Sequence, residues 1–355
     1  MMAAVLTMAM AAAMIGGCGN STDTSNAGNS TNTTESSADA ADTAKDTAQN
    51  TADKTVYKVG IVQYVDDASL NQIEKAIEAE LDAKGAELGV TFDYADYTYN
   101  GQADSSTLNQ IAADLVAEGV DVIIPIATPA AMIMQNATED NQIPVVFSAV
   151  SDPVGAGLVA SADAPGANIT GTSDAIDVAQ IMDFILAADP DAAKIGFLYD
   201  KSQDSSTSAI QAAKDYCDEH GISYVEKTGT TTGEIQAAAD SLVAEKVDAM
   251  TAELAIFEKF ADAGIPHYTS ADSFALNGAF LGYGVNYETL GTKTADMVAD
   301  ILANGADPAT TPVETLDSGI VTVNTEIAEK VGIDYSIFKD MCSELIETVT
   351  AEEFN

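Results

Sequence analysis

The sequence predicts an α/β protein of two Rossmann-like lobes, each built on a parallel sheet covered by helices. From residue 56 onward, short apolar runs alternate with segments of helical periodicity. The chain has 355 residues, 46% of them hydrophobic, which suffices for two domains of ~150 residues with sizeable cores. A strand–helix–strand unit also occurs twice, as GVDVIIPI…NQIPVVFS (119–148) and KVDAMTAE…AGIPHYTS (246–270). Such repeats form parallel sheets, with a ligand cleft expected at the carboxyl ends of the strands.

In the first half, four apolar runs predict strands, at 56–63, 90–97, 120–126 and 143–148. Helices are expected between them. Ser69 is a candidate N-cap for the first helix, and a second helix is expected around Leu108–Leu115. Thr128, followed by Pro129, has the pattern of an N-cap residue with proline in the first turn of a third helix.

The second half continues the alternation. Helices are expected at 174–188, 204–220 and 231–245, and strands at 193–199, 222–228, 247–250 and 265–269. We expect the first lobe to comprise 56–172 and about 285–312, and the second 173–284 and about 313–355. Cys217 and Cys342 lie on helical patterns, and whether they form a disulfide is left open.

The first 17 residues predict an export signal. Residues 2–15 are apolar and uncharged but shorter than the ~20 residues that span a bilayer, and Gly16-Gly17-Cys18 follows. Small residues before a cysteine resemble a bacterial lipobox, which implies lipidation of Cys18. No basic residue precedes the apolar run, which departs from that pattern. The alternative is an ordinary cysteine within a signal peptide.

Residues 18–55 predict a disordered tether after the lipidated cysteine. Of the 35 residues from Asn20 to Lys54, 30 are Ser, Thr, Asn, Asp or Ala. Such a stretch cannot bury enough apolar surface to offset the entropy of ordering. The order of anchor, spacer and globular body predicts an extracytoplasmic protein held at the cell membrane.

The composition excludes several functions. The net charge is −42, with 56 acidic residues against 14 basic ones, which argues against nucleic acid as a partner. Three cysteines and two histidines supply neither a zinc finger nor a disulfide framework, so no metal is expected. The glycine loops that hold dinucleotides and triphosphates do not occur, and neither does Gly-x-Ser-x-Gly. We therefore expect no cofactor, and a binding protein in preference to an enzyme.

Several polar residues are placed to bind a small ligand. Thr128 and Ser206 fall at helix starts, where free N–H groups suit an anion, although both can be simple caps. Ser148, Ser151 and Asp152 follow a central strand and otherwise form a plain turn. Asp272 follows the strand at 265–269. It is a candidate partner for a ligand ammonium group, the alternative being an exposed hinge carboxylate.

The motifs in order carry a family resemblance. They are Gly60–Tyr64 with Ser69-Leu70, Ile126–Ala130, Phe147–Pro153, Ile169–Ser173, Leu198-Tyr199 before Ser205-Ser206, and Gly282–Tyr287. From about residue 56 to its end, the chain resembles the tryptophan/tyrosine type of ABC-transporter substrate-binding proteins, which have the two-lobed type I periplasmic-binding fold. The candidate ligand-binding residues are Gln63, Tyr64, Ser69, Thr128, Ala130, Ser148, Ser151, Asp152, Ser205, Ser206 and Asp272.

The resemblance implies a lipid-anchored solute receptor that delivers an amino acid, aromatic by preference, to a permease driven by a separate ATPase. Two rivals remain. One is a ligand sensor of the same fold that signals to a membrane kinase, and the other is a receptor for another solute, such as a nucleoside or sugar. An extracytoplasmic enzyme would need a nucleophile–base pair, which we do not find.

One departure from the family lies in the second half. Family members carry a Pro-Thr-Asp-Asn-like loop after the strand that corresponds to 247–250, whereas here Thr251-Ala252-Glu253-Leu254 follows. The internal repeat supports a deletion, because Asp121 to Pro144 spans 23 residues and Asp248 to Pro266 spans 18. Part of the second lobe's cleft wall is therefore expected to be missing.

Overall fold

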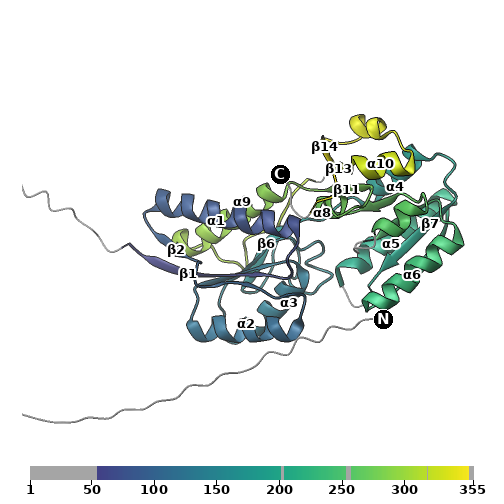
Figure 1. The fold of residues 1–355 in the computed structure, drawn as a ribbon. Coiled ribbons are helices and arrows are strands. Elements are labelled where there is room, and N and C mark those ends of the chain that lie inside the picture. Colours follow the sequence, from purple (N-terminus) through teal and green to yellow (C-terminus); the bar gives the residue numbers. More distant parts are fainter. Residues whose placement is uncertain (1–53, 201–203, 253–256, 318, 352–355) are drawn as a thin grey trace, which may run out of the picture. The chain divides into compact units, whose positions relative to one another are not determined.

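The computed structural model describes residues 54–200, 204–252, 257–317 and 319–351 (Figure 1). The predicted signal peptide, Cys18 and nearly all of the predicted tether lie outside these ranges. No helix within them has the length and apolar character needed to cross a membrane.

Within the described residues, the first sheet has seven strands, all of them parallel. Its order is β12-β6-β5-β4-β1-β2, with β3 also paired to β1. The strands are β1 (Val56–Gln63), β2 (Thr91–Asp93), β3 (Thr98–Asn100), β4 (Val122–Ile126), β5 (Val145–Phe147), β6 (Ile169–Ser173) and β12 (Glu314–Thr315). Two helix pairs cover its two faces (Figure 1): α1 (Ala68–Leu88) with α9 (Tyr287–Asn304), and α2 (Ser105–Glu118) with α3 (Thr128–Thr138).

In the part of the chain that the structure describes, the second sheet also has seven strands, in the order β14-β13-β11-β10-β9-β7-β8, and only its β11–β13 pair is antiparallel. The strands are β7 (Lys194–Tyr199), β8 (Ser223–Thr228), β9 (Ala249–Ala252), β10 (His267–Thr269), β11 (Leu281–Gly284), β13 (Ile320–Asn324) and β14 (Glu344–Thr348). The helices are α4 (Val178–Ala188), α5 (Asp204–His220), α6 (Thr232–Glu245), α7 (Phe257–Asp262), α8 (Asp272–Leu276), α10 (Thr325–Val331) and a 3₁₀ helix at Tyr335–Asp340. The predicted α/β fold with two parallel-dominated sheets is thus confirmed.

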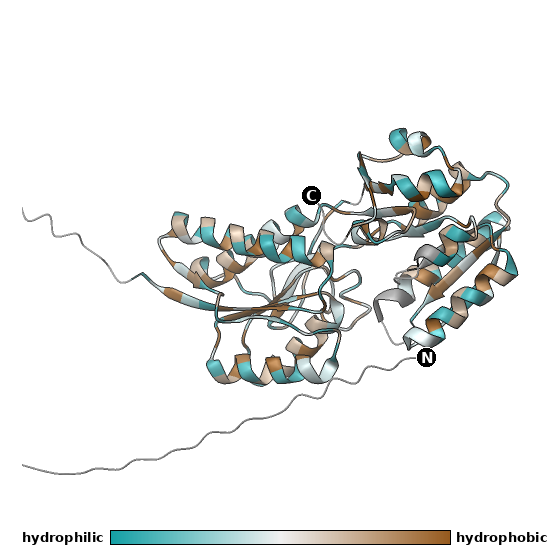
Figure 2. Ribbon diagram, viewed as in Figure 1, coloured by the Kyte–Doolittle hydropathy of each residue, from teal (hydrophilic) through white to brown (hydrophobic). Residues whose placement is uncertain are grey.

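The hydropathy pattern explains why the strands lie inside. Figure 2 shows hydrophobic residues along the central strands, whereas the surface helices carry hydrophobic and hydrophilic residues in alternating bands. Every side chain of β4 is buried, as expected for a parallel strand with helices on both faces.

The internal repeat appears as identical contacts in the two sheets. Asp121 Oδ2 accepts a hydrogen bond from the backbone N–H of Lys58 at 2.7 Å, and Asp248 Oδ2 accepts one from that of Lys194 at 2.9 Å. Each lysine Nζ also donates, at 2.8 Å, to the carbonyl of the last residue of α2 or α6. Residues 119–148 and 246–270 are therefore one unit used twice, as predicted.

The register of this repeat locates the shortened segment. Ile123 N–H donates to Pro144 O at 2.9 Å, and Met250 N–H donates to Pro266 O at 3.1 Å, so these positions correspond. The second unit is thus five residues shorter between equivalent points. The described helix α7 has six residues, against eleven in α3. Strand β9 extends to Ala252, two residues beyond its predicted end, and 253–256 lie outside the described residues.

Two predicted elements are wrong in detail. Residues 90–97 do not form one strand, because a turn closed by Tyr97 N–H to Tyr94 O separates β2 from β3. These two short strands pair with the beginning and the end of β1. Cys342 does not lie on a helix but between the 3₁₀ helix and β14. Cys342 and Cys217 are both free thiols.

Two predicted helix caps are also wrong. The N-cap of α1 is Asp67, whose Oδ1 accepts from the N–H groups of Ser69 and Leu70 at 2.9 and 3.3 Å. The N-cap of α3 is Ala127, which has φ 81° and makes no side-chain cap bond. Ser69 and Thr128 therefore lie inside the first turns, and their hydroxyl groups are not used for capping.

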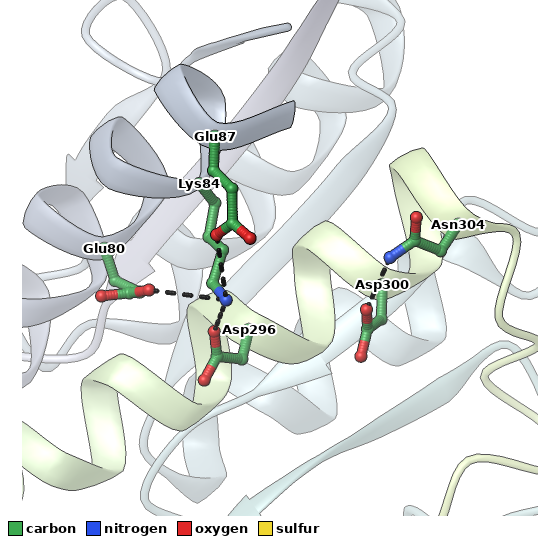
Figure 3. Close-up of polar contacts among 6 residues, drawn as sticks. All are labelled: Glu80, Lys84, Glu87, Asp296, Asp300 and Asn304. Carbon is green, nitrogen blue, oxygen red and sulfur yellow. Dashed lines mark hydrogen bonds and ion pairs between the residues drawn. The ribbon is translucent and has the colours of Figure 1, made fainter. Parts of the chain in front are cut away.

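Helices α1 and α9 are far apart in sequence but lie side by side on the first sheet. Figure 3 shows Lys84 of α1 between the acids Glu80 and Glu87 of its own helix and Asp296 of α9. Its Nζ lies 2.8 Å from Asp296 Oδ1 and 3.8 Å from each glutamate. Exposed ion pairs of this kind contribute little to stability, so close packing must hold the helices together.

Gly291 permits that close packing. A Cβ at this position would lie 2.5 Å from the carbonyl oxygen of Ile73 and 2.8 Å from the Cβ of Ala76. Only a glycine therefore allows α9 to approach α1 this closely. Through this contact, α9 packs on the first sheet, although it follows β11 of the second sheet in the chain.

Candidate functional site

A cavity of about 470 Å³ lies at the carboxyl ends of β1, β5, β6 and β10. The first turns of α1, α3, α8 and α9 complete its wall. The lining residues therefore come from segments next to the first sheet and from segments next to the second. Ligands of α/β proteins usually bind at this end of parallel strands. The aromatic and hydroxyl side chains in the wall are Tyr64, Ser69, Thr128, Ser151, Ser270, Ser273, Phe274 and Tyr287.

A second cavity of about 270 Å³ adjoins the first. Ser151, Asp174 and Ser270 line both, so they mark the junction. The remainder of its wall comes from Asp152, from the segment leading into α4 and from α5. Together the two cavities have the volume of a typical small-molecule site, ~300–1,000 Å³.

Four of the predicted ligand-binding residues meet at the first cavity. Tyr64 follows β1, Ser69 and Thr128 lie in the first turns of α1 and α3, and Ser151 follows β5. Asp152 lines the second cavity, and its Oδ1 accepts a 2.7 Å hydrogen bond from the N–H of Gly155.

Three other predicted residues lie away from the cavity walls. Gln63 is 3% exposed, and its Nε2 donates to Asn71 Oδ1 at 2.8 Å. Ala130 is buried in the apolar cluster beneath α3. Ser148 is fully buried in a network with Thr172 and Thr294. Each points into the first sheet's own packing, a direction that motif order does not reveal.

Ser205 and Ser206 fall in the first turn of α5, but their side chains lie outside the described residues, as does Cys18. Nothing in the geometry bears on their predicted roles.

Asp272 begins α8 and lies beside the first cavity. Its carboxylate accepts hydrogen bonds from Ser69 Oγ at 2.5 Å and from Gln72 Nε2 at 3.3 Å. Burial raises the pKa of this carboxyl group, and the two hydrogen bonds oppose the rise. The alternative of an exposed hinge carboxylate is therefore wrong. Its neighbours Ala271 and Ser273 line the cavity.

The position of Asp272 depends on a glycine in the adjacent strand. A Cβ on Gly282 would lie 2.1 Å from the carbonyl oxygen of Ala271, so any other residue would push the start of α8 away from β11. This gives a physical reason for the glycine in the Gly282–Tyr287 motif.

Asp174 is a site residue that the sequence analysis missed. It follows β6 directly, is half-buried and lines both cavities, and Ser151 Oγ donates to its Oδ1 at 2.9 Å. Burial raises the pKa of its carboxyl group. The available signal was its place immediately after the Ile169–Ser173 motif, at the end of a strand.

Phe274 and Tyr287 were also missed. Phe274 lies in α8 and Tyr287 begins α9, two helices that the sequence analysis did not predict, yet both rings line one cavity with Tyr64. They give the site aromatic surface from three separate segments of the chain.

The beginning of α3 forms the part of the wall suited to an anion. Thr128 and Pro129 line the cavity, the helix has no side-chain cap, and its first-turn N–H groups lie at the positive end of the helix dipole. Among the residues that the structure describes, no group of acidic, histidine or cysteine side chains could hold a metal ion. The site thus combines aromatic faces, hydroxyl groups, a helix N-terminus and a carboxylate.

Comparison with known proteins extends these findings. The family model described as "ABC transporter substrate binding protein" matches residues 58–338. A tyrosine-binding protein of Clostridioides difficile (strain R20291) is 32% identical over 289 residues, covering 78% of this chain and 81% of the relative.

Two solved structures match at similar identity. An ABC domain from Streptococcus pneumonia in complex with L-Trp has a TM-score of 0.74 and 30% identity, covering 82% of this chain and 100% of that one. The ligand-free, open structure of a substrate-binding protein with adhesive properties from Clostridium difficile has a TM-score of 0.64 and 31% identity, covering 83% and 100%.

Proposed function

This chain belongs to the family of ABC transporter substrate-binding proteins, as its motifs predicted, and we propose that it binds an aromatic L-amino acid outside the cell membrane and delivers it to an ABC permease. The family and the type I periplasmic-binding fold define a receptor for a small ligand. The nature of the ligand, the lipid anchor and the delivery step are our proposal.

The observation that carries the proposed ligand is the aromatic wall of the first cavity. Tyr64 reaches it from the segment that follows β1, and Phe274 and Tyr287 reach it from α8 and α9. Aromatic rings pack against one another in stacked or edge-to-face geometry and gain ~0.5–1.5 kcal/mol beyond the area they bury. A ligand with an aromatic side chain uses these surfaces better than an aliphatic one does.

The polar part of the same wall suits the other end of an amino acid. A ligand carboxylate is stabilised at the uncapped first turn of α3, beside the Thr128 hydroxyl, which is needed because the chain contains no arginine. Two relatives support the class of ligand, since one is named a tyrosine-binding protein and the other was solved with L-Trp.

The place of action is proposed from the sequence. A lipid on Cys18 and the tether of residues 18–55 would hold the globular part at the outer surface of the membrane, within reach of a permease. The net charge of −42 argues against attachment of the protein to anionic lipids through basic residues.

Fluorescence offers a direct test of the ligand, because the protein has twelve tyrosines and no tryptophan. Bound L-tryptophan is then the only indole. Excitation of tyrosine should transfer energy to it, and its emission should shift to the blue as it is buried. L-Tyrosine should compete for the site, whereas a nucleoside and a sugar should not.

A ring variant sharpens this test. Phe274→Leu keeps an apolar side chain at the wall but removes the ring, and should weaken L-tryptophan binding by roughly 3- to 10-fold, the equivalent of ~0.5–1.5 kcal/mol. Val154→Leu, at an exposed position outside both cavities, is the control and should bind as the parent does. If the parent binds a nucleoside or sugar and neither aromatic amino acid, the proposed ligand is wrong.

A further inference from the structure

We propose that Asp174 binds the ammonium group of the ligand, and that the site therefore selects amino acids with a free, protonated α-amine. This inference rests on the proposed function and assigns one group of its ligand to one residue. It replaces Asp272, the carboxylate that the sequence suggested for this role.

The position of Asp174 is the first argument. It lines both cavities at their junction. A ligand whose ring lies against the aromatic wall or in the second cavity can therefore place its ammonium group against Asp174. Its Oδ1 accepts the hydroxyl of Ser151 at 2.9 Å, which fixes the carboxylate without using most of its ~four lone-pair positions. An ammonium group has three donors to place on such a carboxylate.

The other carboxylates that line the cavities, Asp67 and Asp152, already hold the backbone. Asp67 accepts from the N–H groups of Ser69 and Leu70 at the start of α1. Asp152 accepts from the N–H of Gly155 within its own loop. Both are therefore committed to local structure.

Asp272 is committed as well. It receives hydrogen bonds from the side chains of Ser69 and Gln72 and from the N–H of Ser273, and it is not among the residues that line either cavity. We regard Asp272 as a positioning residue, which orients the Ser69 hydroxyl at the cavity wall.

The charge around Asp174 also supports the assignment. Among the described residues that line the two cavities there is no lysine and no histidine to balance Asp174. Burial raises the pKa of its carboxyl group, because the charged form has lost water. A ligand cation placed against it returns the lost stabilisation, whereas a neutral or anionic group does not.

Selectivity follows from this pairing. A site built around a buried polar group rejects ligands that leave that group unpaired. N-Acetyl-L-tyrosine and 3-(4-hydroxyphenyl)propionate keep the ring and the carboxylate of tyrosine but lack the ammonium group, and both should bind weakly.

The experiment combines ligand and protein variants. Isothermal titration of the purified protein with L-tyrosine, L-tryptophan and 3-(4-hydroxyphenyl)propionate is repeated on Asp174→Asn, Asp272→Asn and Asp163→Asn. Asp163 is an exposed loop residue that lines neither cavity, so its variant is the matched control for loss of one negative charge. Circular dichroism and thermal melting confirm that each variant folds.

We expect Asp174→Asn to weaken both amino acids by roughly 10- to 100-fold, the range of a lost charge-assisted hydrogen bond. Its affinity for the deaminated analogue should be unchanged or higher, because that ligand has no ammonium group to lose. Asp272→Asn should cost less than Asp174→Asn, and Asp163→Asn should cost nothing.

Three outcomes overturn the inference. The first is a folded Asp174→Asn variant that binds the amino acids as the parent does. The second is an equal loss for amino acids and deaminated analogue, which would make Asp174 a purely structural residue. The third is a parent that binds neither amino acid, which removes the proposed function as well and is thereby distinguished from the first two.

Discussion

Ser69 Oγ donates a 2.5 Å hydrogen bond to Asp272 Oδ1, although 203 residues separate them in the chain. Ser69 Oγ also accepts a hydrogen bond from the N–H of Ser273 at 3.2 Å. Ser69 belongs to α1, which packs on the first sheet, and Asp272 begins α8, which contacts β11 of the second. One hydroxyl group thus connects helices attached to the two sheets, beside the cavity.

Removing this hydroxyl should destabilise the protein. Ser69→Ala leaves a half-buried carboxylate without its shortest donor and removes one of the acceptors of Ser273 N–H, for which we expect a loss of about 1–3 kcal/mol in the free energy of unfolding. Urea unfolding measures it. Ser106→Ala, at an exposed position in α2, should change stability by less than ~0.5 kcal/mol.

A double-mutant cycle tests whether the effect belongs to this pair. Combined with Asp272→Asn, Ser69→Ala should cost less than it does in the parent, because the partner is already altered. Fully additive losses would show that Ser69 stabilises the fold in some other way.

Asp174→Asn should raise the melting temperature of the ligand-free protein at pH 7. Burial raises the pKa of Asp174 above its ordinary value, so the folded state binds its proton more tightly than the unfolded state does. The ionised carboxylate therefore destabilises the fold at pH values above its folded pKa. Each kcal/mol regained corresponds to ~2–4 °C in a protein of 150–250 residues, and somewhat less here.

The pH dependence gives the sign of this effect. As the pH falls through the raised folded pKa toward the ordinary value of 3.8, Asp174 becomes protonated in the parent and its cost disappears. The two melting curves should therefore converge at low pH. A gap that stays constant from pH 7 to pH 4 would contradict a role for the carboxylate charge.

Thr294 should matter for stability and not for ligand binding. Its fully buried Oγ1 lies 2.9 Å from Ser148 Oγ and 2.8 Å from Thr172 Oγ1, which joins α9 to β5 and β6. Thr294→Val keeps the shape but leaves these hydroxyl groups short of a partner, at a cost of about 1–3 kcal/mol. Chemical denaturation gives the cost, and titration with L-tyrosine below the unfolding transition should give the parent affinity.

Ser148→Ala tests whether Ser148 binds the ligand, as the sequence suggested, or only stabilises the fold. Because Ser148 is buried in this network, we expect the variant to lose stability and keep its affinity. A loss of affinity as large as that of Asp174→Asn would return Ser148 to the binding site.

Cys18 should carry the lipid, and the mature protein should begin there. Metabolic labelling with a palmitate analogue should mark the parent chain and not Cys18→Ala, and the variant should no longer fractionate with membranes. Cys342→Ala is the control, because it removes a different free thiol and should leave labelling intact. Equal labelling of the parent and Cys18→Ala would exclude this anchor.

Much of the fold could be predicted because its signals are local. β1 has its predicted bounds, and α5 runs over the predicted residues 204–220. The equivalence of Asp121 and Asp248 was also readable, since the same short motif needs the same backbone partners in each half. The predicted ends of elements were wrong where a single hydrogen bond decided them, as with the cap of α1 by Asp67 and the turn between Tyr94 and Tyr97.

The site could be predicted only in part, because side-chain direction depends on packing. Ser148 and Ser151 are three residues apart in one motif, yet the first is fully buried against α9 and the second lines both cavities. Asp174 and Asp272 each follow a strand and look alike in the sequence. Their hydrogen-bond donors differ. Ser69 and Gln72 donate to the carboxylate of Asp272, whereas Ser151 donates to that of Asp174, which also lines both cavities.

The sequence by itself thus determined the alternation of strands and helices, the repeated unit and the family, because hydrophobic periodicity and contiguous motifs are properties of neighbouring residues. Only the tertiary structure decided which residues share a cavity. Tyr64, Asp174 and Phe274 lie in segments about 100 residues apart. The first two follow parallel strands of the first sheet, whose carboxyl ends lie at one edge, and Phe274 follows β10 of the second sheet and lines the same cavity. The same folding brought Ser69 against Asp272 and placed Asp174 in the walls of both cavities.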